Sequence, residues 1–113
     1  MELVFLIYLF VGIIFMAISI PLIKRKVKIN NWYGIRLPET MKNEKLWYEV
    51  NEKSGKHLFI FGIAICLLTL ALYFSEFFSY TVSFWIMTFL ILVGTITIAI
   101  LAFSITNRLS QMK

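Results

Sequence analysis

Hydrophobic and polar positions divide the chain into three long apolar runs, separated by one long polar segment and one short connector. The apolar runs cover residues 3–23, 58–74 and 81–105. A helix rises about 1.5 Å per residue, so about 20 apolar residues cross a hydrocarbon core of about 30 Å. The first and third runs reach this length, and the second reaches it if its helix extends back toward Ser54. The pattern predicts an all-α membrane protein with three transmembrane helices.

Composition agrees with a lipid environment for these runs. Apolar residues make up 60% of the 113 residues, compared with roughly 45–50% in an average soluble protein. A soluble domain of this length could not bury so much apolar surface. The length suits one domain, and we expect residues 1–113 to form a single membrane domain. The single cysteine, Cys66, excludes an intrachain disulfide.

The first apolar run is interpreted as a retained helix and not as a cleaved signal peptide. Only Met1 and Glu2 precede it, so it lacks the basic region that opens a signal peptide. The run is also long for such a peptide, and no pair of small residues marks a cleavage site after it. We therefore expect residues 3–23 to remain in the membrane.

Basic residues are distributed unevenly around the three predicted spans. Nine of the 11 Lys and Arg residues lie in the polar segment, residues 24–57, and the other two lie near the C-terminus. The N-terminus and the 75–80 connector carry none. The positive-inside rule therefore predicts that the polar segment and the C-terminus are cytoplasmic and that the N-terminus lies outside. The basic run at residues 24–28 either marks this topology or contacts anionic lipid, and both can hold.

Each predicted span carries small or weakly polar residues at helical spacing. Without a hydrophobic force between helices in lipid, such residues mark faces where backbones approach closely. Span by span they are Gly12, Met16 and Ser19; Gly62, Cys66 and Thr69; and Thr88, Thr95, Ala99 and Ala102. We interpret them as the packing faces of a three-helix bundle, with a ligand groove as the alternative. No ionisable residue lies in the middle of a span, which argues against a proton relay or an ion path.

Turn-forming residues open the polar segment and a helix is predicted to follow. Asn30, Asn31 and Gly34 favour a turn. Pro38 favours an extended conformation at the residue before it. Thr40 is the predicted N-cap of a helix that begins directly after it and runs into the second span.

One face of that predicted helix is polar and aromatic. Asn43, Trp47, Asn51 and Gly55 recur every four residues, so they share a face. The two amides can hydrogen-bond the preceding turn. Arg36, whose guanidinium offers five donors, is the predicted centre of this network, with both amides, Glu39 and Glu44 as partners.

Two interpretations of the network remain open at this point. Arg36 either pins the turn to the helix or holds a lipid phosphate or a peptide carboxylate. Trp47 is interpreted as an anchor at the membrane interface, where amphipathic rings concentrate, more than as a platform for a ligand.

The same residues resemble a family signature that spans about 25 positions. The matching residues are Asn31, Gly34, Arg36, Pro38, Thr40, Asn43, Trp47, Asn51 and Gly55. This run resembles the signature of the SdpI/YfhL family of bacterial membrane proteins. Asn30 and Asn31 both fit its first position, and Leu37 stands where a small hydroxyl residue is expected.

The resemblance implies a small immunity protein of the bacterial cytoplasmic membrane. Such a protein confers resistance to a secreted antimicrobial toxin peptide without catalysis, and its partners are the lipid bilayer and that peptide. The alternative implied by the family is a signalling receptor that binds toxin and sequesters a cytoplasmic repressor. A small transporter or a holin-like pore is a third class. It is disfavoured because the only acids outside the polar segment, Glu2 and Glu76, lie at membrane edges.

Isolated reactive side chains argue against an enzyme. His57 and Cys66 stand nine residues apart, which is about 13 Å along a helix. No acid pair, metal-ligand spacing or glycine-rich phosphate loop occurs in the sequence. We expect no cofactor and no metal. Nucleic-acid binding is not expected either, because the membrane topology already accounts for the basic residues.

Overall fold

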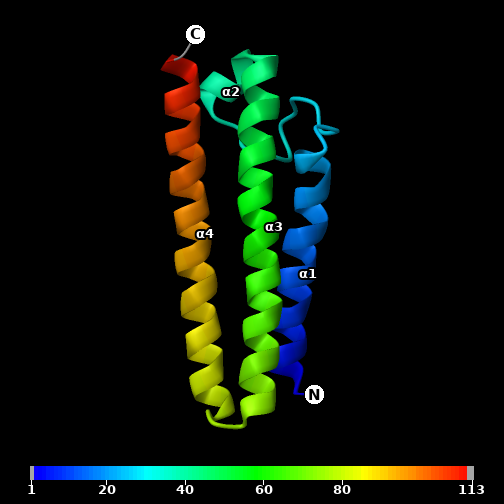
Figure 1. Cartoon of the computed structure of the whole chain (residues 1–113), viewed down its shortest axis with the longest axis vertical. Helices are drawn as coiled ribbons and strands as arrows, with labels where there is room; N and C mark the ends of the chain where they lie inside the picture. The colour runs from blue at the N-terminus through cyan, green and yellow to red at the C-terminus, as the bar shows by residue number, and fades with distance from the viewer. Residues whose placement is uncertain (1, 112–113) are drawn as a thin grey trace.

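The computed structural model describes residues 2–111, and these form four helices (Figure 1). Helix α1 covers Leu3–Ile23, α2 covers Pro38–Lys42, α3 covers Glu44–Ser75 and α4 covers Tyr80–Gln111. Helices α1, α3 and α4 are long and apolar enough to cross a membrane. The prediction of an all-α membrane protein with three spans is confirmed.

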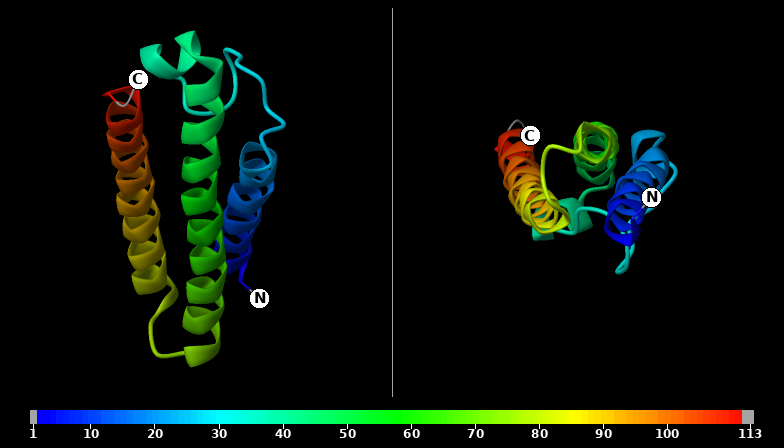
Figure 2. Two further views of the ribbon diagram at one scale, coloured as in Figure 1. Left: turned by 45° about the horizontal axis from the view of Figure 1, so that its top comes forward. Right: turned by 90° about the horizontal axis from the view of Figure 1, so that it is seen from below.

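Helix α3 stands between α1 and α4 and joins them into a bundle of 52 × 22 × 19 Å (Figures 1 and 2). It packs closely along α1 and less closely along α4, while α1 and α4 touch little. The N-terminus and the 76–79 connector lie at one end of the bundle (Figure 1). The polar segment, α2 and the end of α4 lie at the other. The basic and the non-basic parts of the chain are therefore separated along the bundle axis.

Helix α3 is longer than its apolar part. Its 32 residues extend over about 48 Å at about 1.5 Å per residue, compared with about 30 Å of hydrocarbon. Residues 44–57 therefore project beyond the predicted span 58–74 as the same continuous helix. Helix α4 likewise extends the predicted span 81–105 to Gln111. The second span and residues 44–57 of the polar segment are thus parts of one continuous helix.

The start of α3 corrects the predicted N-cap. Asn43 has an extended backbone with φ −138° and ψ 109°, and its side-chain oxygen accepts a hydrogen bond from the Leu46 amide at 3.2 Å. Asparagine is among the preferred residues at this position. Thr40, the predicted N-cap, lies inside α2, because Pro38 is accommodated in the first turn of a separate helix. Two helices that meet at Asn43 replace the single predicted helix.

Two glycines bring the backbones of α1 and α3 into contact. A Cβ added at Gly62 would lie 2.7 Å from the Gly12 carbonyl oxygen. A Cβ added at Gly12 would lie 2.8 Å from the Gly62 carbonyl oxygen and 2.6 Å from Cys66 Sγ. Ser19 and Thr69, further along the same two faces, are fully buried. The predicted packing faces of the first two spans are confirmed.

The predicted face of the third span is correct only in part. Thr88 is half-buried and Ala102 is buried, but Thr95 and Ala99 are exposed. The face toward α3 passes instead through Gly94, against which a phenylalanine ring of α3 packs. Because Gly94 has no side chain, the phenylalanine ring of α3 fits between α3 and α4. The close contact of the two backbones that the sequence pattern predicted is therefore not made there.

Enlarging Gly62 will separate α1 from α3. We expect Gly62→Val to destabilise the protein by about 1–3 kcal/mol, the usual cost of overpacking a filled interface. Thermal unfolding in detergent, followed by circular dichroism, measures the loss. Ala71→Val is the matched control, because Ala71 lies on the exposed side of the same helix. Equal melting temperatures for the two variants would contradict the close contact.

Candidate functional site: the polar segment

Asn30 holds the turn that opens the polar segment. Its Oδ1 accepts hydrogen bonds from the backbone amides of Trp32 at 2.8 Å and Tyr33 at 2.7 Å. Its Nδ2 donates to the Lys28 carbonyl at 2.7 Å. Asn31, the other candidate for the first signature position, has an exposed side chain and contributes its backbone carbonyl. The local side-chain bonds that asparagine makes in turns are therefore made by Asn30.

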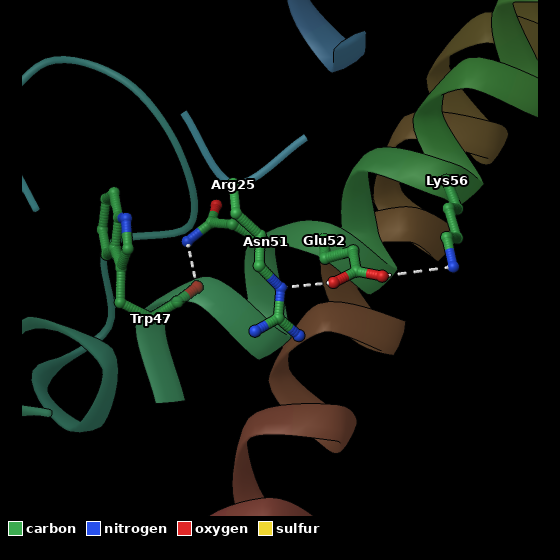
Figure 3. A network of polar contacts seen from close by, with 5 residues as sticks. All are labelled: Arg25, Trp47, Asn51, Glu52 and Lys56. Atoms are coloured by element: carbon green, nitrogen blue, oxygen red, sulfur yellow. Dashed lines mark hydrogen bonds and ion pairs between the residues drawn. The ribbon is translucent and has the colours of Figure 1, made fainter. Parts of the chain in front are cut away.

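Asn51 links this turn to α3 and is only 2% exposed. Its Oδ1 accepts a hydrogen bond from the Ile35 amide at 2.6 Å. Its Nδ2 donates to the Trp47 carbonyl at 2.9 Å (Figure 3). Buried amides require such partners, and Asn51 finds one in the turn and one in its own helix. The prediction that amides on α3 hydrogen-bond the turn is confirmed for Asn51.

Gly34 lies directly against Asn51 and Trp47. Its φ of +108° favours glycine, and a Cβ there would lie 2.9 Å from Asn51 Oδ1 and 3.0 Å from the Trp47 ring. Trp47 is fully buried, and its Nε1 donates to the Val27 carbonyl at 2.7 Å. The interpretation of Trp47 as an interface anchor is wrong. Its ring is enclosed because the chain folds back over this face of α3 on its way to α2.

Thr40 binds the turn from the other side. Its hydroxyl donates to the Ile35 carbonyl at 2.8 Å and accepts from the Leu37 amide at 3.0 Å. The side chain is fully buried. Ile35 is therefore held at its N–H by Asn51 and at its carbonyl by Thr40, and these bonds fix the backbone on both sides of Arg36.

Arg36 is not the centre of the network that the sequence predicted. Its side chain is exposed, and one guanidinium N–H donates to the Asn31 carbonyl at 2.5 Å. In residues 2–111 it makes no hydrogen bond or ion pair with Glu39, Glu44 or the two α3 amides. In the described residues the guanidinium bonds within the turn, and Asn51 makes the contact between turn and helix that was expected of Arg36.

Gly55 and Asn43 complete the signature on α3. A Cβ at Gly55 would lie 3.2 Å from the Ser19 carbonyl and 3.1 Å from the Ile23 side chain, so this glycine lets the end of α1 approach. Asn43 caps the helix. The buried signature side chains therefore build and support the turn, and Arg36 carries its charge on the outside.

An ion-pair bridge that sequence analysis missed ties the chain after α1 to α3. The Glu52 carboxylate lies 2.5 Å from Arg25 Nε and 3.3 Å from Lys56 Nζ (Figure 3). Hydrogen bonds from Arg25 and then Lys56 lower the pKa of Glu52, which sits on the part of α3 beyond the apolar span. The spacing of Glu52 and Lys56 by four residues was the available signal. Exposed pairs add little stability, so the bridge chiefly orients the basic chain.

A cavity of about 310 Å³ separates the turn from α4. Its lining residues are 34–37 of the turn and Ala99, Ala102 and Phe103 of α4. No cluster of His, Cys, Asp and Glu that could hold a metal occurs in the part of the chain that the structure describes. One arginine and six uncharged residues therefore line this cavity.

Three apolar helices with an ordered polar segment at one end define a small multi-pass membrane protein. The chain belongs to the SdpI/YfhL protein family, whose model matches residues 26–104. The matched range covers most of the chain and includes every signature residue from Asn31 to Gly55. No curated protein and no solved structure matches the chain.

Removing the Asn51 amide will release the turn from α3. Asn51→Ala leaves the half-buried Ile35 amide without its side-chain partner, and such a loss costs about 1–3 kcal/mol. We expect a lower melting temperature and faster hydrogen exchange at the Ile35 amide. Asn31→Ala is the control, because Asn31 accepts the Arg36 hydrogen bond with its backbone carbonyl, which the substitution keeps. Equal exchange rates in both variants would contradict the central role of Asn51.

Proposed function

We propose that the protein is a small integral immunity protein of the bacterial cytoplasmic membrane. It confers resistance to a secreted antimicrobial toxin peptide and performs no catalysis. The family match over the whole signature carries this proposal, since the resemblance of those residues implies immunity. The hydrogen bonding of Asn51 and Thr40 supports the absence of catalysis. Both side chains are committed to backbone groups and do not activate a reacting atom.

The proposed orientation places the polar segment in the cytoplasm and the N-terminus outside. Residues 24–57, which carry nine Lys and Arg residues, and the last turns of α4, which carry Arg108, lie toward the same end of the bundle (Figure 1). The start of the chain and the connector after α3 lie at the opposite end (Figure 1), where Glu2 and Glu76 line one pocket and the described residues include no Lys or Arg. This separation supports the orientation that the positive-inside rule favours.

Arg36 is the proposed working contact of the site. In the proposed orientation, the polar segment meets only a toxin that has already entered the bilayer. Protection then takes place within the membrane, either by binding the inserted peptide or by altering the lipid around it. The turn holds the backbone of Arg36 in place before anything binds, and the Asn31 carbonyl accepts a hydrogen bond from its guanidinium, which lowers the entropic cost of the contact.

Protection will depend on the charge of Arg36. In cells exposed to a toxin against which the chain protects, we expect Arg36→Gln to reduce survival to that of cells without the protein. Lys42→Gln, which removes an exposed charge of the same segment, should protect fully. Trp47→Ala should also fail, but through unfolding, since truncating a buried tryptophan costs about 3–5 kcal/mol. Full protection by a correctly inserted Arg36→Gln variant would contradict the role of Arg36.

Single cysteines will report the orientation in a Cys66→Ala background. A membrane-impermeant maleimide should label Ser79→Cys, in the connector, in intact cells. It should label Lys42→Cys, in α2, only after the membrane is permeabilised. The reverse pattern would contradict the proposed topology.

A further inference from the structure

We propose that the cavity between the turn and α4 binds one anionic phospholipid, with its phosphate on Arg36 and an acyl chain along α4. This proposal deepens the proposed function, because it assigns a ligand to the same arginine. The lipid proposal requires only that the protein lies in a bilayer, and it does not depend on the identity of the toxin.

The depth of the cavity suits a phospholipid. Residues 99–103 of α4 lie two to six positions before the end of the apolar run at Ile105, which is about 3–9 Å into the hydrocarbon. Ile105 itself packs with Leu46 and Val50 beneath the turn, beside Ile35. The cavity therefore lies where headgroup phosphates meet the first part of the acyl chains.

Arg36 provides a phosphate-binding group at this depth. A guanidinium has five N–H donors in a planar fork, and the described contact with the Asn31 carbonyl uses one of them. The fork geometry matches two oxygens of a phosphate. The bonds of Ile35 to Asn51 and Thr40 hold the backbone beside Arg36 in place before a ligand arrives.

The α4 residues that line the cavity provide an apolar surface for the acyl chain of the lipid. Ala99 and Ala102 are small and stand beside Phe103, so they leave a strip along α4 that a hydrocarbon chain can follow. A volume of about 310 Å³ is near the lower limit of ligand pockets, about 300–1,000 Å³. It accommodates a phosphate and the start of one chain better than a folded peptide segment.

The charge of the lining favours an anionic lipid over a zwitterionic one. The seven lining residues include one cation and no acid, so no carboxylate there can pair with a choline ammonium group. The surrounding basic segment also raises the local concentration of anionic lipid.

Native mass spectrometry of the full chain in detergent micelles tests the site, with phosphatidylglycerol and phosphatidylcholine as probes. We expect retention of one phosphatidylglycerol in preference to phosphatidylcholine. Arg36→Gln should weaken phosphatidylglycerol binding about tenfold, as expected for the loss of a charge-assisted hydrogen bond to the phosphate. Ala99→Leu should also weaken it, because the added side chain fills the strip. Circular dichroism checks that each variant remains folded.

Two matched controls separate the site from general attraction. Lys42→Gln removes a charge from the same segment, and Ala71→Leu adds volume to an exposed position of α3; both should bind as the original chain does. Equal weakening by Arg36→Gln and Lys42→Gln would overturn the proposal, as would equal retention of the two lipids. Arg36-dependent binding of a synthetic amphipathic peptide with no lipid preference would overturn it as well. An Arg36→Gln variant that loses the lipid but still protects cells supports the lipid site and contradicts the immunity role of Arg36.

Discussion

The paired hydrogen bonds of the Asn51 side chain are the interaction on which the polar segment depends. One amide group offers an acceptor to the Ile35 backbone and a donor to the Trp47 carbonyl, and it does so at a buried position. Because a buried polar group without partners is costly, the turn cannot leave α3 without leaving the Asn51 oxygen and the Ile35 amide unpaired. The fold of the turn, the enclosure of Trp47 and the direction of Arg36 all follow from this attachment.

Because α3 is continuous, the turn attached to its first part is also held in place relative to the membrane-crossing bundle. The helix that carries Trp47 and Asn51 passes without a break into the span that packs against α1. The contact between Gly12 and Gly62 brings the two backbones together within the membrane, and Gly55 does the same near its surface. The polar segment therefore has a fixed position relative to two of the three spans.

The sequence predicts the spans well because lipid imposes a simple rule. A run of about 20 apolar residues has no stable alternative to a helix in a bilayer, so hydropathy alone locates α1, α3 and α4. Small residues also locate the contact of α1 with α3, although the exposure of Thr95 and Ala99 shows that a similar pattern on α4 did not mark its interface. There the large ring against Gly94 decides the packing.

The site was predicted less completely, because its hydrogen bonds go to backbone groups. The residues of the signature indicated a network, but side-chain chemistry alone favoured Arg36 as its centre, since a guanidinium has the most donors. Which amide or carbonyl lies near a side chain depends on the path of the chain. The break at Asn43 and the turn at Gly34 set that path, and neither the buried Trp47 nor the role of Thr40 could be read from spacing.

The glycine at position 34 has a consequence for how this protein can change over generations. Any side chain there meets two separate obstacles, an unfavourable backbone angle and the adjacent Trp47 ring and Asn51 oxygen. A smaller residue in place of Trp47 would relieve the steric contact but not the unfavourable φ at position 34. No single second substitution therefore makes another side chain acceptable there. Sequence change is therefore channelled to the outward-facing surface, while the support beneath it stays the same.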